Sequence, residues 1–390
     1  MKFIIEETMD REKSREQRAK RRRRRRIIKS VFWVAVLGVA AWFFLFGNDM
    51  ISFSGIKRYF SEVFTSGGST SLAVLNGTSV QDVHMLGNDM VVISDIGGQV
   101  LNKNGGEVIT FQHGCTNPAV ASDGNRFLVF DRDGTRYEVY NKNGLIHEGT
   151  TEYPIIDAAI ASNGSYVIVS GSKSYHNEAH FYKASGEETY VWYSADNYIY
   201  KTAIKGDGKR FAVLGMNANG GEVSSYAFLF EPSSKGEPIK VPLNENICYA
   251  ASYKGNRLTV IGKSSAYSIS ADGAVKNTYA YGERELEGYT DTDSKSILVF
   301  SKYGVGREHT VVILDSSVKE KKTADVALDF RCVTVNGKNI TVLGSHEVCV
   351  YSTSLSLKHT EPISADGTYA YTIGKNIFVF GVGNISKFTY

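Results

Sequence analysis

Short runs of consecutive apolar residues recur along most of this chain, each set between polar turns. The clearest example lies in residues 122–144, SDGNRFLVFDRDGTRYEVYNKNG. This segment has the order turn, apolar strand, turn, alternating strand, turn, which predicts part of an antiparallel sheet. The eight runs of this kind are MVVIS (90–94), FLVFD (127–131), YVIVS (166–170), FAVLG (211–215), LTVIG (258–262), ILVFS (297–301), ITVLG (340–344) and IFVFG (377–381).

The spacing of these runs predicts a β-propeller. Their central residues are Val92, Val129, Ile168, Val213, Val260, Val299, Val342 and Val379, at intervals of 37, 39, 45, 47, 39, 43 and 37 residues. A repeat of about 40 residues that holds about four strands is typical of propeller blades. The second strand of a blade is covered on both faces by its neighbours and need not alternate. We expect an all-β fold with eight blades over residues 71–390, or seven if one irregular unit is an excursion.

The last unit predicts how the ring closes. It offers strands near residues 368–372, 377–381 and 385–389, and the chain stops one strand short of a blade. Residues 71–76 (SLAVLN) form an unassigned apolar strand that can supply the missing outer strand and leave no open edge. We call the end of the propeller with the first-to-second and third-to-fourth turns the bottom, and the other end the top. The chain would then enter from the bottom, which favours a membrane on that side.

An apolar segment near the N-terminus predicts a membrane anchor. From Ile27 to Phe46 the chain reads IIKSVFWVAVLGVAAWFFLF, 20 residues long, directly after six arginines at 21–26. A helix of that length spans about 30 Å, the thickness of a bilayer core. The arginines predict a cytoplasmic N-terminus and an extracytoplasmic propeller. We therefore expect a single-pass cell-membrane protein with an uncleaved signal-anchor; a cleaved signal peptide is the alternative.

Charge and composition refine this organisation. The net charge of +3 combines +8 in residues 1–30 with −5 in the remainder, so the basic character belongs to the tail, residues 1–26. An arginine run beside a membrane segment is explained by topology, and we expect no nucleic-acid partner. Residues 47–70 form a linker in which residues 54–64 have the apolar spacing of a short amphipathic helix. The 42% apolar content excludes global disorder.

Four cysteines are present, without a CxxC pair: Cys115, Cys248, Cys332 and Cys349. Cys332 and Cys349 fall on the first and third strands of one predicted blade. Two strand spacings separate them by about 10 Å, beyond the reach of a disulfide. We expect mostly buried free thiols.

Two features indicate where a site could lie. Polar residues stand ten to twelve positions before the strand centres, where first strands begin at the top of the channel: Asp82, Asn117, Asp157, Lys201, Glu287 and Arg331. Such a ring could bind a polar ligand at the channel mouth, or its members could satisfy one another and the blade connections. Three second-to-third loops are also enlarged, at 171–179, 216–225 and 302–309, and could form a binding surface on the top.

The other motifs do not predict chemistry. His176 and His180 are four apart but in a predicted loop without a third ligand, so we expect no metal site. Asp131 and Asp133 in FDRDG lack the remaining acidic ligands of a calcium loop and predict a turn. No nucleophile elbow is present. The sequence thus predicts no catalytic, metal or cofactor site.

At residues 184–192, ASGEETYVW, the chain resembles the blade motif of quinoprotein-like eight-bladed propellers. It also resembles membrane-anchored propellers of unknown function from Gram-positive bacteria, and WD-repeat proteins in its period, although no GH…WD signature occurs. Trp192 is the only tryptophan outside the membrane segment, and no vicinal cysteines occur. The resemblance therefore implies the scaffold and counts against a bound quinone.

Three functions fit these features. The first is a binding or scaffolding module at the cell surface, whose membrane-distal loops contact a protein or cell-wall polymer. The second is an extracytoplasmic hydrolase, lyase or oxidoreductase with its site at the channel mouth. The third is a sensor that signals through the helix to the basic tail. We expect the first, because no catalytic motif is present and the tail is short.

Overall fold

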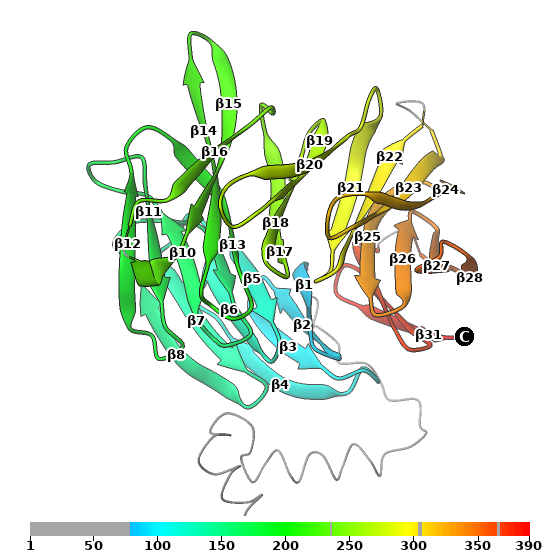
Figure 1. Ribbon diagram of the computed structural model, residues 1–390. Coiled ribbons are helices and arrows are strands. Elements are labelled where there is room, and N and C mark those ends of the chain that lie inside the picture. The colour runs from blue at the N-terminus through cyan, green and yellow to red at the C-terminus, as the bar shows by residue number, and fades with distance from the viewer. Residues whose placement is uncertain (1–78, 235, 303–305, 365–366) are drawn as a thin grey trace, which may run out of the picture. The chain divides into compact units, whose positions relative to one another are not determined.

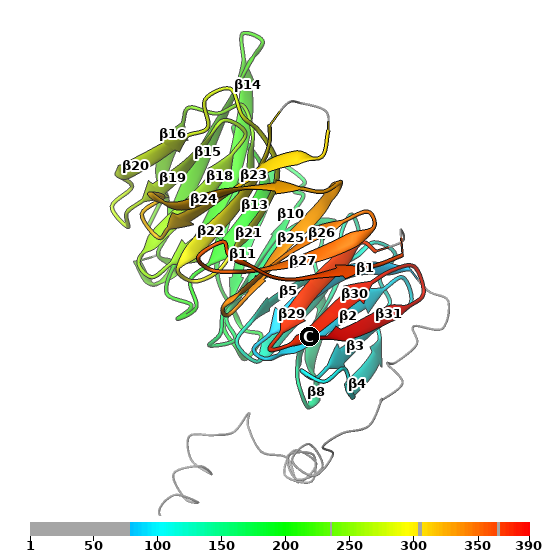
Figure 2. The same cartoon turned by 90° about the vertical axis from the view of Figure 1, so that its right-hand side faces the viewer.

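Eight antiparallel sheets follow one another along the chain and surround a common axis (Figures 1 and 2). The computed structural model describes residues 79–234, 236–302, 306–364 and 367–390. Seven of the described sheets have four strands and the last has three. In each sheet the strands pair in chain order, so the first strand lies innermost and the last outermost. The all-β, eight-bladed propeller that the sequence predicts is confirmed.

We number the blades in chain order. Blade 1 contains β1 (Val80–Leu86), β2 (Asp89–Ser94), β3 (Gly97–Leu101) and β4 (Glu107–Gln112), and blade 2 contains β5 (Pro118–Asp123), β6 (Arg126–Asp131), β7 (Arg136–Asn141) and β8 (Gly144–Thr150). Blade 3 contains β9 (Ile155–Ile160), β10 (Tyr166–Ser170), β11 (Asn177–Tyr182) and β12 (Glu188–Ser194), and blade 4 contains β13 (Tyr198–Ile204), β14 (Phe211–Asn219), β15 (Glu222–Phe230), the 3₁₀ helix η1 (Pro232–Ser234) and β16 (Ile239–Leu243).

The second half of the ring repeats this order. Blade 5 contains β17 (Cys248–Lys254), β18 (Arg257–Gly262), β19 (Ser265–Ile269) and β20 (Val275–Ala280), and blade 6 contains β21 (Glu285–Asp291), β22 (Lys295–Ser301), β23 (Glu308–Asp315) and β24 (Glu320–Ala327). Blade 7 contains β25 (Phe330–Asn336), β26 (Asn339–Gly344), β27 (Glu347–Ser352) and β28 (Leu357–Pro362), and blade 8 contains β29 (Tyr369–Ile373), β30 (Asn376–Phe380) and β31 (Ile385–Thr389).

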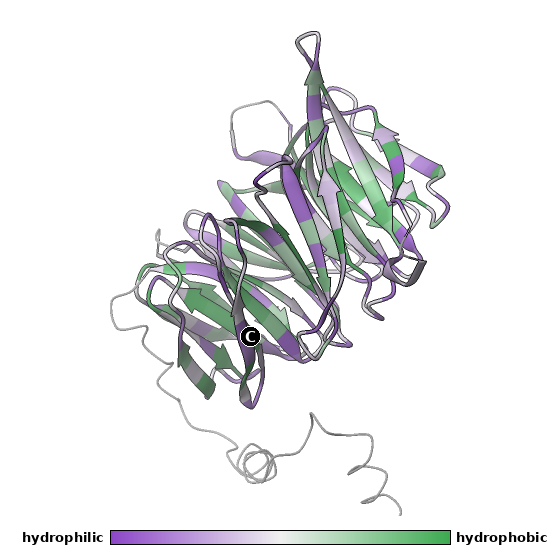
Figure 3. Cartoon of the chain, turned by 90° about the vertical axis from the view of Figure 1, so that its left-hand side faces the viewer, coloured by the Kyte–Doolittle hydropathy of each residue, from purple (hydrophilic) through white to green (hydrophobic). Residues whose placement is uncertain are grey.

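The second strands form the apolar centre of the blades, as predicted. All eight predicted centres lie on second strands and are almost fully buried: Val92, Val129, Ile168, Val213, Val260, Val299, Val342 and Val379. Most of these strands are buried along nearly their whole length, because both of their faces pack against adjacent blades. Figure 3 shows the apolar colour concentrated along the strands and the polar colour at many turns.

The hydrophobic core lies between blades rather than within one. Blades 3 and 4, for example, share one cluster that includes Phe181 from β11 and Phe211 and Phe230 from β14 and β15. Trp192, the residue of the quinoprotein-like motif, lies on β12 and packs against Phe228 and Phe230 with ring centroids 5.1 Å apart in both cases. Each such aromatic side chain removes a large apolar area from water, so these contacts hold neighbouring blades together.

Glycine makes the tight turns at the bottom possible. Gly124 and Gly208 follow Asp123 and Asp207 in first-to-second turns and have φ angles of +61° and +67°. A side chain at such a position is strained, and glycine accepts it without cost. The predicted hairpin turns are therefore confirmed at these positions.

One local prediction was wrong in detail. Residues 216–225 are not a loop, because β14 and β15 continue as a paired hairpin out to Asn219 and Glu222. This hairpin projects from blade 4 in Figure 1. On β7 the polar residue Glu138 is only 2% exposed, and it accepts hydrogen bonds from Tyr140 and Arg136 at 2.6 and 2.8 Å.

Side chains join the last blade to the first. The Tyr369 hydroxyl donates to the Gln81 carbonyl at 3.1 Å, and the Tyr371 hydroxyl donates to the Val83 carbonyl at 3.0 Å. Ser79 also forms an isolated antiparallel bridge with Val382. Residues 71–76, predicted as the closing outer strand, lie outside the described residues.

The four cysteines are free, as expected. Three of them are buried and Cys332 is half-buried; Cys332 lies on β25 and Cys349 on β27, with β26 between them. Among the residues that the structure describes, no helix is long and apolar enough to cross a membrane. The predicted anchor at residues 27–46, the tail and the linker all lie outside that part of the chain.

Candidate functional site

A central channel is enclosed by the first strands of the blades. It contains two cavities, of about 830 and about 900 Å³. Both cavities are lined by Asp82, His84 and Asp123 from blades 1 and 2 and by Tyr289 and Asp291 from blade 6, so they are two lobes of one space. The lining mixes acidic, basic and tyrosine side chains, which suits a polar ligand.

Two of the predicted channel residues join neighbouring blades. Asp157 on β9 accepts a hydrogen bond from the Thr202 backbone N–H at 2.8 Å and pairs with the Lys201 amino group at 3.2 Å, both on β13. Asp82 on β1 is placed in the same way, with the Val120 N–H of β5 at 3.4 Å. The two carboxylates therefore serve equivalent joints, between blades 3 and 4 and between blades 1 and 2.

Burial affects these two carboxylates differently. Burial raises the pKa of Asp157 and outweighs the opposing charge of Lys201. At Asp82 burial also acts to raise the pKa, but the hydrogen bond and charge of His84, whose ring lies 3.3 Å away, help to hold the pKa below its usual value. Neither environment resembles that of an exposed surface acid.

The remaining predicted residues have other partners. Glu287 pairs with the buried ring of His309 at 2.7 Å, and Arg331 donates to the Gly367 carbonyl at 2.7 Å. Lys201, Glu287 and Arg331 line the channel, whereas Asn117 does not. Asn117 lies in the connection before β5, where its N–H donates to Asp131 at 2.7 Å. The structure thus places five of the six along the channel: Asp157 and Lys201 line one lobe, Glu287 and Arg331 line the other, and Asp82 lines both.

Arg132 also lines the channel, although no sequence pattern singled it out. It lies in the loop after β6, in the segment predicted as a turn, rather than at the start of a first strand. Its backbone N–H donates to the Asn117 carbonyl at 2.9 Å, and the next residue, Asp133, has a φ of +63°. Counting back from the strand centres finds only first-strand residues, so it misses a loop residue that lines the channel.

The bottom of the channel carries a buried ion pair. Lys254 at the end of β17 is 3% exposed and contacts Asp291 of β21 at 2.7 Å. Asp291 also accepts from Ser252 at 3.2 Å and from Ser296 at 2.6 Å, so its oxygens are shared among three donors. Since Lys254 belongs to blade 5 and Asp291 to blade 6, this pair joins the two blades. Breaking it would destabilise the protein, because a buried charge would be left without a partner. Asp291 therefore has structural partners in both blades.

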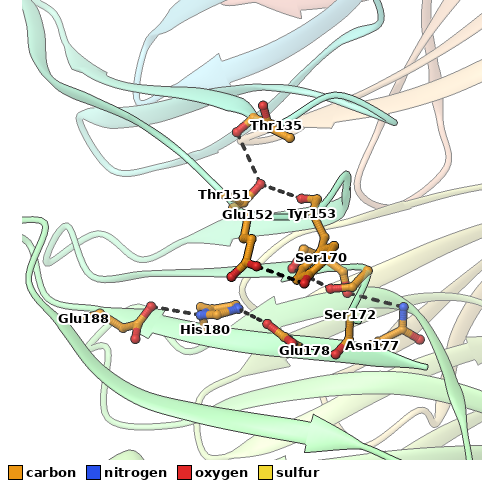
Figure 4. Close-up of polar contacts among 11 residues, drawn as sticks. Thr135, Thr151, Glu152, Tyr153, Ser170, Ser172, Asn177, Glu178, His180 and Glu188 are labelled. Carbon is orange, nitrogen blue, oxygen red and sulfur yellow. Dashed lines mark hydrogen bonds and ion pairs between the residues drawn. The ribbon is translucent and has the colours of Figure 1, made fainter. Parts of the chain in front are cut away.

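The upper part of blade 3 carries a polar network (Figure 4). His180 lies on β11, not in the predicted loop, and its two ring nitrogens lie 3.1 Å from Glu178 and 2.8 Å from Glu188. Glu178 also accepts from Ser172 at 2.6 Å. The network contains one histidine and two carboxylates, and within the described residues no group of side chains is arranged to hold a metal ion.

Exposed aromatic rings lie beside this network at the top of blade 3. We call Tyr175, His176, Tyr193 and Tyr198 the blade-3 aromatic surface. The three tyrosines are 47%, 49% and 58% exposed. The rings of Tyr175 and Tyr193 have centroids 5.1 Å apart, and those of His176 and Tyr198 are 4.1 Å apart.

The loop that carries two of these rings is held in place from both sides. The Asn177 side chain donates to the Ser170 carbonyl at 3.3 Å and accepts from the Ile199 N–H at 2.7 Å. The His176 N–H donates to the Ser194 carbonyl at 2.9 Å. The predicted enlarged loop at 171–179 therefore shortens to residues 171–176 between β10 and β11. It is a fixed platform on the top, formed at the boundary of blades 3 and 4.

The other two enlarged segments differ from this one. Residues 216–225 form the hairpin described above, whose tip is exposed. The third segment, 302–309, includes residues 303–305, which lie outside the described part of the chain. The blade-3 aromatic surface is therefore the best-defined candidate for a contact on the top.

Comparison with solved structures shows the fold. The chain is similar to a structure titled "Crystal Structure Of The C-Terminal WD40 Domain Of Sif2", with a TM-score of 0.57, 11% identity, and coverage of 83% of this chain and 99% of that one. It is also similar to "Crystal structure of the eukaryotic initiation factor", with a TM-score of 0.53, 10% identity, and coverage of 82% and 85%. At these identities the likeness concerns the propeller architecture alone.

No curated protein matches the sequence. A family model does match, over residues 68–387, which is most of the chain and includes almost the whole propeller. Its description is "Family of unknown function (DUF5711)". The structural likeness agrees with the predicted similarity to WD-repeat propellers, and the family match agrees with the predicted domain of unknown function. The chain belongs to the DUF5711 family.

Proposed function

We propose that this protein is a membrane-anchored, extracytoplasmic binding or scaffolding module that presents the top of its propeller to a protein or a cell-wall polymer. The observation that carries this proposal is the blade-3 aromatic surface. Exposed tyrosine and histidine rings on a fixed loop and on the adjoining ends of two strands, with Ser and Asn nearby, resemble the composition of surfaces that bind partners with little loss of conformational entropy. A large exposed aromatic cluster is otherwise unfavourable on a protein that has no partner.

The channel carboxylates support binding rather than catalysis. Asp157 and Glu287 are the acids nearest to a role in proton transfer, and both already have partners. Asp157 contacts Thr202 and Lys201 of the next blade, and Glu287 contacts His309 of its own blade. A general acid or base needs access to a substrate proton. Their contacts favour a structural role, between blades 3 and 4 for Asp157 and within blade 6 for Glu287.

The membrane setting rests on the sequence. The apolar segment at residues 27–46 and the arginines before it favour a cytoplasmic tail and a propeller outside the membrane. A tag on the C-terminus should be digested by protease added to intact cells, while a tag on the N-terminus should be protected. Protection of the C-terminal tag would reject the extracytoplasmic placement.

Partner capture tests the binding function. The full-length chain should retain a partner from cell-envelope extracts, and Tyr175→Ala with Tyr193→Ala should reduce retention about tenfold or more. A matched control is Leu357→Ala, which removes a side chain that is 57% exposed at the bottom end of blade 7. Treatment of the extract with protease distinguishes a protein from a polymer. Equal retention by the tyrosine variant and the control would reject the surface.

A further inference from the structure

The polar groups at the channel mouth differ in whether they are free to contact a ligand. Its carboxylates are occupied by the protein: Asp82 by Val120 and His84, Asp157 by Thr202 and Lys201. A carboxylate whose oxygens already accept backbone and cationic donors has little capacity left for a cation or a hydroxyl group. The donors at the mouth therefore decide what can bind there.

Arg132 differs from the other donors at the channel mouth in the contacts of its guanidinium. Within the described part of the chain, its guanidinium has no carboxylate or carbonyl within hydrogen-bonding distance, and its one close contact is the Phe130 ring, whose centroid is 5.9 Å away. The side chain is exposed and lines the cavity of about 830 Å³. A guanidinium offers five N–H donors in a planar fork, and in this position the fork is open.

The backbone around Arg132 is fixed at the boundary of blades 2 and 3. The Arg132 N–H donates to Asn117, the Asp133 N–H donates to Ile155 at 2.9 Å, and the Ile155 N–H donates back to Gly134 at 2.6 Å. Arg132 and Ile155 form a parallel bridge, which ties the loop to the first strand of the next blade. An arginine on a clamped loop is held ready for a ligand, which lowers the entropic cost of binding.

The charge of Arg132 also acts on groups that belong to other blades. Burial acts to raise the pKa of Asp82, Asp157 and Tyr369, and the positive charge of Arg132 acts to lower each of them. These three groups belong to blades 1, 3 and 8, whereas Arg132 belongs to blade 2. The charge of Arg132 therefore acts on groups of three other blades in the part of the ring around blade 2.

We propose that the channel mouth is a binding site for a small molecule with one carboxylate group, and that Arg132 holds this group with its guanidinium fork. The geometry of a guanidinium matches the two oxygens of a carboxylate. Asp82 and Asp157 line the same cavity as Arg132, and their negative charge disfavours a phosphate dianion more than a single carboxylate. This site is separate from the blade-3 aromatic surface and does not depend on its partner.

Calorimetric titration of the full-length chain tests the site. The probes are lactate, glutamate and glucuronate, with glucose, inorganic phosphate and potassium chloride at matched ionic strength as controls. We expect at least one carboxylate to bind at millimolar concentration or below, and glucose and chloride not to bind. Arg132→Gln should raise its Kd about tenfold or more, because a charge-assisted bidentate contact is lost. Arg132→Lys should recover only part of the affinity, since it keeps the charge and loses the fork.

A matched control keeps the change of charge the same. Arg307→Gln removes another exposed guanidinium at the top, paired with Glu347 at 2.9 Å and outside the channel lining, and should bind like the unaltered protein. In the unaltered protein, the bound carboxylate should also protect Arg132 from phenylglyoxal, as mapped by peptide mass spectrometry.

Four results would overturn the site. They are no binding by any carboxylate probe, tighter binding of phosphate than of the carboxylates, an unchanged Kd in Arg132→Gln, and no protection of Arg132. Loss of partner capture by the tyrosine variant with intact carboxylate binding would separate the two proposals.

Discussion

Asp157 accepts one contact from Lys201 and another from the Thr202 backbone, and both donors belong to the next blade. The sequence predicted that this residue would lie at the channel mouth and left open whether it binds a ligand or satisfies a blade connection. The structure shows the second kind of contact. Sequence register could place the residue because the repeat is regular, but the identity of its partner depends on how two blades meet.

Removal of the Asp157 contacts between blades 3 and 4 should lower the stability of the protein. Asp157→Ala should lower the free energy of unfolding by about 2–3 kcal/mol, because the buried Thr202 N–H loses its acceptor. Asp157→Asn keeps an acceptor and should cost less. Asp293→Ala is the control in the same channel, since Asp293 is exposed. Urea unfolding measures all three, and equal stability of Asp157→Ala and the control would contradict the joint.

His147 should make stability depend on pH. Its ring lies 3.0 Å from the Tyr166 hydroxyl in the next blade, and burial, with the nearby charge of Arg126, lowers its pKa. The unfolded chain then binds a proton more readily than the folded chain. Stability from this group is complete at high pH and is lost as pH falls through about 6.5, the value of a free histidine.

The test is urea unfolding of the unaltered protein and of His147→Gln between about pH 5 and pH 8. The stability of the unaltered protein should gain more over this range than that of the variant, because glutamine does not titrate there. Parallel curves for the two proteins would contradict the assignment.

The cysteines should be inert in the folded protein. Burial raises the pKa of Cys115 and of Cys248 to about 12, and that of Cys332 to about 11. Since the thiolate is the reactive form, iodoacetamide at pH 8 should modify these thiols far more slowly in the native chain than in urea. Mass spectrometry gives the extent of modification, and rapid native labelling of Cys115 would show that its surroundings open.

Among the elements, the second strands could be predicted and the hairpin of β14 and β15 could not. The second strands have continuous apolar runs because both of their faces are covered. Residues 216–225 read MNANGGEVSS, a composition typical of loops, yet the backbones pair through Asn219 and Glu222. Arg132 could not be predicted for a related reason, because the local sequence does not show which loop side chain will line the channel.

The outer part of this hairpin should be dispensable for folding. Residues 218–223 are exposed, and both turn glycines, Gly220 and Gly221, have positive φ with open space around them. Replacement of residues 218–223 by a two-residue Asn-Gly turn should change the free energy of unfolding by less than about 1 kcal/mol. Thermal and urea unfolding measure this, and a larger loss would show that the hairpin supports the ring.

For the whole molecule, the joint between blades 8 and 1 differs from the others because no described chain connection crosses it. Tyr369 and Tyr371 make its hydroxyl contacts to blade 1. Tyr369→Phe with Tyr371→Phe should lower the free energy of unfolding by about 1–2 kcal/mol. Tyr289→Phe, which removes a hydroxyl contact between blades 6 and 5, is the control and should cost less because Tyr289 is exposed. A smaller loss in the double variant than in the control would contradict this.

The described part of blade 8 ends at β31 with three strands, so the outer side of that strand has no described neighbour. Backbone groups along such a side recognise the main chain of an incoming strand and not its sequence. Residues 71–76 have the pattern of a strand that could fill it from within the same chain. A second copy of the protein could offer the same kind of strand, with the same bonds. Any interaction that holds a strand of the same chain against that edge therefore also prevents a second copy of the protein from pairing there.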